Sequence, residues 1–262
     1  MVLRQVNLSR QLHPVMGGRK LYCLLQSFLA EHQIKMGRDA LFDLLAANGL
    51  LVKKRKRRIA TTQSFHWLKK YPNLIKDWHP GKPRQLWVAD ITYVPVSNGF
   101  LYLSLITDAY SHKIMGYSIA ENLSAIHTIK ALEMALTDDT GPRTELIHHS
   151  DRGMQYCSTE YTNLLKTNQI TISMTESGDP LENAVAERIN GIIKEEYLQH
   201  YEVTTCQEAQ DILEAVIERY NTQRPHTSIN MLTPATVHQL ALPVNRTWSK
   251  KQSLNIAKQY QG

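Results

Sequence analysis

The residues from 146 to 156 read Leu146-Ile147-His148-His149-Ser150-Asp151-Arg152-Gly153-Met154-Gln155-Tyr156. A short apolar run followed by a turn signal is typical of a buried strand. The exit of such a strand places Asp151 at the edge of a sheet, where open sheets commonly hold their functional groups. Asp151 is therefore a candidate site residue.

A second aspartate lies in the segment 86–94, which is rich in residues that favour strands. Asp90 stands at its centre. A lone charge in a buried strand costs about 2 to 5 kcal/mol unless it is paired or holds a cation. The position of Asp90 therefore favours a functional role. Asp108, at the end of the next predicted strand, is a rival that could join the site or start a turn.

A third carboxylate is expected on a helix predicted over 180–198. Asp179, Pro180 and Glu182 form a helix start signal of capping side chain, proline and reciprocal glutamate. At about 100° per residue the helix has two faces. The apolar face comprises Val185, Ile189, Ile192 and Ile193. The polar face comprises Asn183, Glu187, Gly191 and Lys194, with the glycine permitting close approach. Glu187 is the best third carboxylate.

Asp90, Asp151 and Glu187, with 35 residues between the last two, resemble the Asp-Asp-Glu triad of bacterial insertion-sequence transposases and retroviral integrases. The resemblance is greatest to the second-frame (OrfB) transposases of the insertion-sequence three family. The phrases that show it are Trp87-Val88-Ala89-Asp90-Ile91-Thr92-Tyr93, His149-Ser150-Asp151-Arg152-Gly153-Met154-Gln155-Tyr156, Glu182-Asn183-Ala184-Val185-Ala186-Glu187 and Tyr220-Asn221-Thr222-Gln223-Arg224-Pro225-His226.

The order of predicted elements indicates an α/β fold. Strands are expected at 86–96, 100–107, 113–120, 146–151 and 170–174, and helices at 125–136, 159–167, 180–198 and 205–220. Three successive strands followed by alternating helices and strands predict a mixed five-stranded sheet with helices on both faces. This order matches the ribonuclease-H-like fold that the resemblance implies.

The N-terminal part predicts a small helical module over residues 1–60. Residues 1–18 are expected to be an irregular lead-in, and helices are predicted at 19–33 and 38–47, the second ended by Asn48-Gly49. The pair suits a helix-turn-helix, with a helical hairpin packed on the core as the alternative. A linker at 61–83, a core at 84–240 and a polar tail at 241–262 complete the expected domains.

The charged residues are distributed unevenly along the chain. Residues 1–80 hold 15 Lys and Arg against 4 Asp and Glu, although the whole chain has a net charge of only +6. A basic front predicts binding of a polyanion, and a mildly acidic remainder suits a protein that holds cations. The predicted DNA contacts are Arg38, Lys53, Lys54, Arg55, Lys56, Arg57, Arg58, Arg152 and Lys194, the run from 53 to 58 supplying affinity rather than sequence choice.

Composition limits the class of protein. The hydrophobic fraction is 42%, and no apolar run approaches the roughly 20 residues that a membrane span requires. A cytoplasmic, nucleoid-associated bacterial protein is expected. Cys23, Cys157 and Cys206 are odd in number and widely spaced, so neither a disulfide framework nor a thiolate zinc site is indicated.

Oxygen ligands favour hard cations, so Asp90, Asp151 and Glu187 are expected to bind Mg²⁺, with two ions and with Mn²⁺ as a substitute. The resemblance implies cleavage at the 3′ ends of a mobile element and strand transfer to a target. It also implies a homo-oligomer on DNA and an upstream-frame helix-turn-helix partner or fusion. Two departures from the family are Glu182, where many relatives have aspartate, and Ser111-His112, where serine-arginine is usual.

Two other functions stay open on sequence alone. One is a ribonuclease-H-like nuclease, since the metal chemistry is shared. The other is a non-catalytic, transposase-derived regulator that only binds DNA. A serine-hydrolase triad is disfavoured, because the adjacent residues His148, His149 and Ser150 would point to alternate faces of a strand. His149 is expected either to touch the metal site or DNA, or to be a packed core residue.

Overall fold

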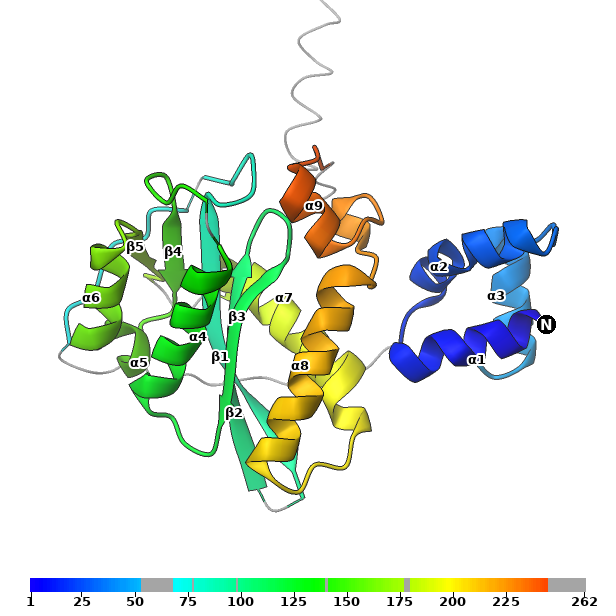
Figure 1. Ribbon diagram of the computed structural model, residues 1–262, viewed down its shortest axis with the longest axis horizontal. Coiled ribbons are helices and arrows are strands. Elements are labelled where there is room, and N and C mark those ends of the chain that lie inside the picture. The colour runs from blue at the N-terminus through cyan, green and yellow to red at the C-terminus, as the bar shows by residue number, and fades with distance from the viewer. Residues whose placement is uncertain (53–67, 77, 98, 140, 177–179, 245–262) are drawn as a thin grey trace, which may run out of the picture.

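A computed structural model describes residues 1–52, 68–76, 78–97, 99–139, 141–176 and 180–244 of the 262-residue chain (Figure 1). Three N-terminal helices, α1 to α3, lie beside a larger α/β unit that contains one sheet. Within the described ranges, no helix has the length and apolar character needed to cross a membrane. All three cysteines lie in these ranges as free thiols, as predicted.

The sheet has five strands in the order β3-β2-β1-β4-β5. The strands are β1 (Leu86–Val96), β2 (Gly99–Asp108), β3 (Ile114–Ala120), β4 (Ile147–Ser150) and β5 (Thr171–Met174). β1, β2 and β3 pair antiparallel, whereas β4 pairs parallel with both β1 and β5. The predicted mixed five-stranded sheet is confirmed, and β1 has the predicted bounds.

Helices cover both faces of this sheet. The helices α4 (Ala125–Asp138), α5 (Met154–Cys157) and α6 (Thr159–Thr167) contribute to one apolar core with Trp87 and Ala89. The helices α7 (Ala184–Ile192) and α8 (Cys206–Thr222) contribute to the other, with Leu103 and Leu105. Side chains alternate along a strand, so β1, β2 and β3 contribute residues to both cores.

The helix predicted over 180–198 is not continuous. Pro180–Asn183 forms a 3₁₀ turn, α7 follows, Ile193–Tyr197 forms a π-helical turn, η2, and Leu198–His200 ends the segment as a second 3₁₀ turn. The predicted cap Asp179 lies outside the described residues. Glu182 instead accepts a hydrogen bond from the Glu176 backbone N–H at 2.9 Å. The predicted apolar face is confirmed, since Ile189, Ile192 and Ile193 are buried.

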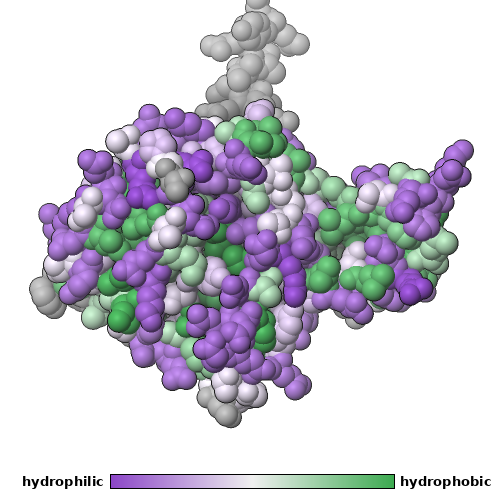
Figure 2. Space-filling model, viewed as in Figure 1, coloured by the Kyte–Doolittle hydropathy of each residue, from purple (hydrophilic) through white to green (hydrophobic). Residues whose placement is uncertain are grey.

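The N-terminal helices are α1 (Val2–Leu12), α2 (Gly18–Glu31) and α3 (Arg38–Ala47). The irregular lead-in predicted for residues 1–18 is wrong, because α1 packs Val6 into a shared core with α2 and α3. α3 has its predicted bounds, and Gly49 adopts the left-handed conformation after it, with φ of +65°. In Figure 2 hydrophobic side chains show on these helices, whereas most of the visible core face is hydrophilic.

The C-terminal part contains a further helix, α9 (Pro234–Leu240), that the sequence reasoning missed. Thr233 caps it through a hydrogen bond from the Thr236 backbone N–H, and Pro234 occupies its first turn. This threonine-proline pair is an ordinary start signal. Of the predicted polar tail, residues 245–262 lie outside the described residues.

Candidate active site

Asp90 lies in the middle of β1, on the face that α7 covers. The strand alternates, so Asp90 shares this face with Val88, which packs against Ala186 of α7. The Asp90 Oδ2 atom accepts a hydrogen bond of 2.8 Å from the Asn190 side chain. Helix and strand are therefore joined at this carboxylate.

Asp151 directly follows β4, next to the middle of β1. Ala89 of β1 pairs with Ser150 of β4, so Asp90 and Asp151 are the next residues along two neighbouring parallel strands. The Asp151 Oδ1 atom accepts from the Gly153 N–H at 2.9 Å. A Cβ atom at Gly153 would itself lie 2.9 Å from Oδ1, so a side chain at this position would displace the Asp151 carboxylate. The predicted strand exit is therefore present.

Glu187 lies in the first turn of α7 and is exposed. Two asparagines fix the helix to β1: Asn190 binds Asp90, and the Asn183 side chain donates to the Ala89 carbonyl at 3.0 Å. The sequence reasoning put Asn183 on the polar face but gave it no role, and it missed Asn190. Asn183 stands four residues before Glu187 and Asn190 three residues after it. Residues at these spacings lie on the same face of a helix, and this is the sequence pattern that could have identified both asparagines.

The three carboxylates influence one another electrostatically. Burial raises the pKa of Asp90 to about 7, and the charges of Asp151 and Glu187 add to the rise. The hydrogen bonds from Asn190 and from the Ile91 backbone oppose it. A carboxylate held near other carboxylates in a desolvated place is stabilised by a cation. Such perturbed groups are frequent in functional sites.

The fit of a metal ion is partial. Among the described residues, no group of three or more His, Cys, Asp or Glu is arranged to hold an ion. The carboxylates supply only oxygen, the donor that hard divalent cations prefer. The raised pKa of Asp90 reflects burial first and repulsion from Asp151 and Glu187 second, and a cation would offset both effects. The donor chemistry therefore suits Mg²⁺, although the three acids do not form a compact ligand set here.

The predicted DNA contacts fall in different places. The Lys194 Nζ atom donates to Thr92 Oγ1 at 3.1 Å, two residues beyond Asp90 and on the same face of β1. Arg152 donates to the Glu176 carbonyl at 3.2 Å. Arg38 is exposed and pairs with Asp39 at 2.8 Å. It is the first residue of α3, which lies apart from the sheet (Figure 1). The run Lys53, Lys54, Arg55, Lys56, Arg57 and Arg58 lies outside the described residues.

The paired histidines are core residues. His148 bonds through Nε2 to the Tyr161 hydroxyl at 2.8 Å, and His149 bonds through Nδ1 to Ser173 Oγ at 2.8 Å. Both are buried, and burial lowers the pKa of His148 to about 3 and that of His149 to about 4. Of the two roles expected for His149, the structure favours packing.

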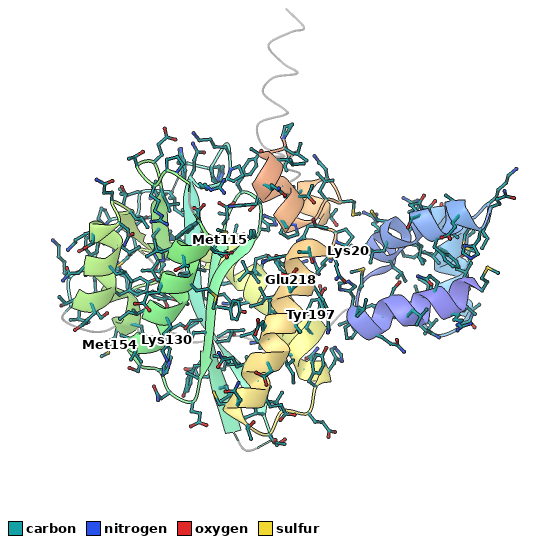
Figure 3. All side chains as sticks on the ribbon, viewed as in Figure 1. Lys20, Met115, Lys130, Met154, Tyr197 and Glu218 are labelled. Carbon is teal, nitrogen blue, oxygen red and sulfur yellow. The ribbon has the colours of Figure 1, made fainter. Side chains whose placement is uncertain are left out.

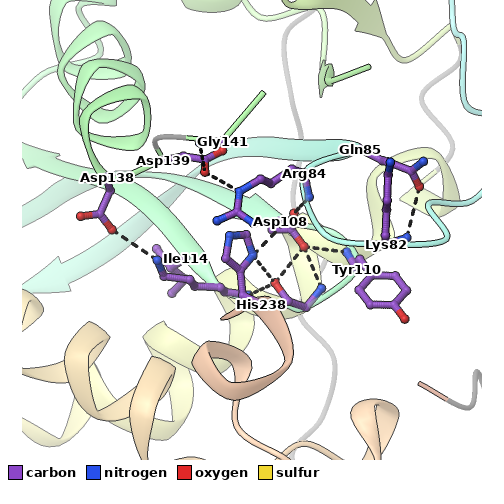
Figure 4. A network of polar contacts seen from close by, with 12 residues as sticks. Lys82, Arg84, Gln85, Asp108, Tyr110, Ile114, Asp138, Asp139, Gly141 and His238 are labelled. Carbon is purple, nitrogen blue, oxygen red and sulfur yellow. Dashed lines mark hydrogen bonds and ion pairs between the residues drawn. The ribbon is translucent and has the colours of Figure 1, made fainter. Parts of the chain in front are cut away.

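Asp108 holds a turn rather than the carboxylate site. Fully buried at the end of β2, it accepts hydrogen bonds from the backbone N–H groups of Arg84, Tyr110 and Ser111. The Ser111 hydroxyl also donates to it, and His238 of α9 lies 3.9 Å away (Figure 4). Of the two roles expected for Asp108, the structure shows the turn. Ser111, the serine of the Ser111-His112 pair in which His112 stands where the family usually has arginine, belongs to this network.

Comparison with known proteins agrees with this geometry. Residues 80–180 match the Integrase core domain family, and residues 168–234 match a second family of the same description. The chain is 40% identical over 223 residues to the insertion element IS600 uncharacterized 31 kDa protein of Shigella sonnei, covering 83% of this chain and 82% of that protein. It is 30% identical over 223 residues to the transposase for insertion sequence element IS629 of Shigella sonnei, covering 85% and 73%.

A solved structure shares the fold. The simian T-cell lymphotropic virus intasome, in complex with PP2A regulatory subunit B56 gamma, matches with a TM-score of 0.54 at 16% identity, over 85% of this chain and 74% of that chain. The sequence relatives extend the likeness from fold to family. The chain therefore belongs to the DDE-type insertion-sequence transposases of the IS3 type, polynucleotidyl transferases built on an integrase catalytic core.

Proposed function

We propose that Asp90, Asp151 and Glu187 are the catalytic triad of this transposase, and that it cleaves DNA at the 3′ ends of an insertion sequence and joins those ends to a target. The observation that supports this most is the electrostatic coupling of three acids from distant parts of the sequence. In the first reaction water breaks one phosphodiester bond and releases a 3′-hydroxyl. In the second, that hydroxyl attacks a target phosphodiester and displaces its 3′ oxygen.

Asp90, Asp151 and Glu187 would hold Mg²⁺, with two ions expected and Mn²⁺ as a substitute. Bound divalent ions supply charge stabilisation to the attacking and leaving oxygens of a displacement at phosphorus. The chain supplies the orientation of these carboxylates: Asn190 fixes Asp90, and Asn183 fixes α7 against β1. Lys194, held by Thr92 beside Asp90, would bind a phosphate next to the reacting one.

The remaining parts of the chain would bring the substrate to these acids. Residues 1–60 would form a DNA-binding module with Arg38 and the run 53–58, joined by a linker at 61–83 to a core at 84–240 that precedes the tail at 241–262. Arg152 would contact the DNA backbone near the triad. The active form would be an oligomer on DNA, together with an upstream-frame helix-turn-helix partner, and would work on the bacterial nucleoid in the cytoplasm.

The test is incubation of the protein with the terminal DNA that flanks its gene, in Mg²⁺, with and without the upstream partner. Joined strands separate a transposase from a nuclease, which would give only cut products. Asp151→Asn should abolish both cutting and joining while DNA binding persists. If Asp151→Asn leaves the DNA-dependent activity unchanged, the protein acts as a non-catalytic regulator and the triad has no role.

A further inference from the structure

A cavity of about 390 Å³ lies between the N-terminal helices and the core, on another face of α7 from Asn190. Four segments line it: α2 through Lys20, the β2–β3 turn through His112, α7 through Arg188, and the segment after α8 through Arg224 and His226. Figure 3 shows Lys20 between α2 and the core. No part of the proposed chemistry uses this cavity.

The cavity is cationic. Lys20, Arg188 and Arg224 line it. Among the described residues, the carboxylate that forms salt bridges with these cations is that of Glu196, which binds Arg224 at 2.7 Å and lies 3.9 Å from Lys20. Burial lowers the pKa of Lys20 to about 8, and the charges of Arg224 and Arg188 add to the decrease. Three cations with one anion leave an excess of positive charge that an anionic ligand would neutralise.

A neutral hydrogen-bond donor lies beside these cations. His226 is 4% exposed, and its Nε2 atom receives a hydrogen bond of 2.8 Å from Arg224. A guanidinium can only donate, so the proton of a neutral His226 is on Nδ1. That N–H group makes no hydrogen bond to the part of the chain that the structure describes. The Nδ1–H group of His226 is therefore a hydrogen-bond donor for a ligand in the cavity, beside the cations.

Apart from Arg188, the side of the cavity that α7 forms is apolar. Val185, Ile189 and Ile192 line it. Cations and a histidine donor suit a phosphate, whereas aliphatic side chains suit the carbon face of a sugar, and the volume exceeds what a phosphate alone would fill. This combination favours a nucleotide over a free phosphate ion.

We infer that this cavity binds one nucleotide of the DNA backbone, with its phosphate between Lys20 and Arg188 and its sugar against Val185, Ile189 and Ile192. The inference rests on the proposed function, since it takes DNA as the substrate. A nucleotide bound here touches both α2 and the helix that holds Glu187. DNA binding would thus fix the N-terminal helices against α7.

The test is DNA binding by the full chain in EDTA, where the carboxylate chemistry plays no part. Lys20→Gln/Arg188→Gln should raise the Kd for a terminal duplex about tenfold and lower the slope of log K against log salt by about 1, the value for one phosphate. The matched control is Lys130→Gln/Lys166→Gln, which removes two cations from α4 and α6, away from the cavity (Figure 3). The inference would be overturned if both double variants lost DNA affinity equally, or if Lys20→Gln/Arg188→Gln lost none.

A second readout uses the wild-type chain and so does not depend on the folding of a variant. The lowered pKa of Lys20 makes its amine reactive toward reductive methylation near pH 8. The duplex should protect Lys20 at least fivefold more than Lys130, and inorganic phosphate at the same phosphate concentration should not. If the duplex and inorganic phosphate both protect Lys20, the cavity is a site for free phosphate. If neither protects it, the cavity is not a binding site, and either result would overturn the inference. If the duplex protects Lys20 but Asp151→Asn still joins strands, the proposed function is refuted and the inference about the cavity is not.

Discussion

Asp90 is the residue on which the proposed chemistry of this protein depends, and its surroundings act on the ionisation of its carboxyl group in both directions. Burial and two neighbouring carboxylates disfavour its ionised form, whereas the amide of Asn190 favours it. A cation would shift this balance toward the ionised form. Asn190 is thus a positioning residue, since it acts through Asp90.

Replacement of Asn190 by alanine should lower strand joining about 10- to 100-fold, the usual cost of losing a partner that orients a metal ligand. The pKa of Asp90 should rise, so the pH at which joining is half-maximal should rise with it. The measurement is a pH profile of joining in Mg²⁺. Asn168→Ala is the matched control, because the side-chain amide of Asn168 also donates a hydrogen bond, in this case to the Leu164 backbone carbonyl, but Asn168 lies away from β1. An unshifted profile would contradict the role of Asn190.

The raised pKa of Asp90 also predicts how the free energy of unfolding depends on pH. The folded value is about 7 and the ordinary value 3.8, so between these values the folded state binds more protons. This contribution to stability is fully present below about pH 4 and is lost as pH rises through 7. Buried His148 and His149, with lowered pKa values, act in the opposite direction.

Comparison with Asp90→Asn isolates the contribution of one carboxyl. The wild type should lose stability relative to Asp90→Asn as pH rises from 5 to 8, measured by urea unfolding in EDTA. Asp39→Asn is the control, since the pKa of exposed Asp39 is lowered by Arg38 and both its folded and unfolded values lie below this range. A constant difference between wild type and Asp90→Asn would show that the pKa of Asp90 is not raised.

At the scale of elements, the segment after Asn183 changes from an α-helix, α7, to a π turn, η2, and so reaches two different sites. α7 presents Glu187 and Asn190, and the π turn η2 then directs Lys194 to Thr92 and Glu196 to Arg224. Single π turns within helices are frequent at functional sites. One chain segment therefore contacts both the carboxylate site and the cationic cavity.

Elements with strong local signals were predicted well, and those set by distant contacts were not. β1, α3 and α6 have the expected bounds, because alternation, helical spacing and caps specify them locally. α1 was missed, since its one buried residue, Val6, depends on packing against α2 and α3. The proposed triad was predicted from sequence motifs and stays a prediction, whereas the bond from Asn190 to Asp90 depends on the packing of α7 against β1.

Replacing either of two glycines by alanine tests the packing of elements, and the two replacements should change the free energy of unfolding in opposite directions. A Cβ atom on Gly116 of β3 would lie 2.0 Å from the Ala131 carbonyl oxygen of α4, so Gly116→Ala should lower the free energy of unfolding by about 1 to 3 kcal/mol or more. Gly191 of α7 has no described atom within 4 Å of such a Cβ, so Gly191→Ala should raise it by about 0.5 to 1 kcal/mol. Urea unfolding measures both, and equal effects would contradict this account of the α4–β3 contact.

At the scale of the whole molecule, the basic front and the acidic site are structurally connected. His13, at the end of α1, shares a 2.7 Å hydrogen bond with Tyr197 of η2, and Lys20 lies near Glu196 of the same turn. The N-terminal helices thus contact the segment that continues the helix of Glu187. DNA held by the front would be held in a defined relation to the triad.

The unequal charge of the chain predicts the salt dependence of DNA binding. Each phosphate neutralised by a cation adds about 0.9 to the slope of log K against log salt. Replacement of all six cations from Lys53 to Arg58 by glutamine should therefore lower the slope by up to about 5, whereas Lys130→Gln/Lys166→Gln should leave it unchanged. Fluorescence anisotropy of a labelled terminal duplex, titrated in EDTA at several salt concentrations, measures both slopes. A slope that the six replacements leave unchanged would mean that the run does not contact phosphates, and that any DNA contact by residues 1–80 is made by other cations, such as Lys20.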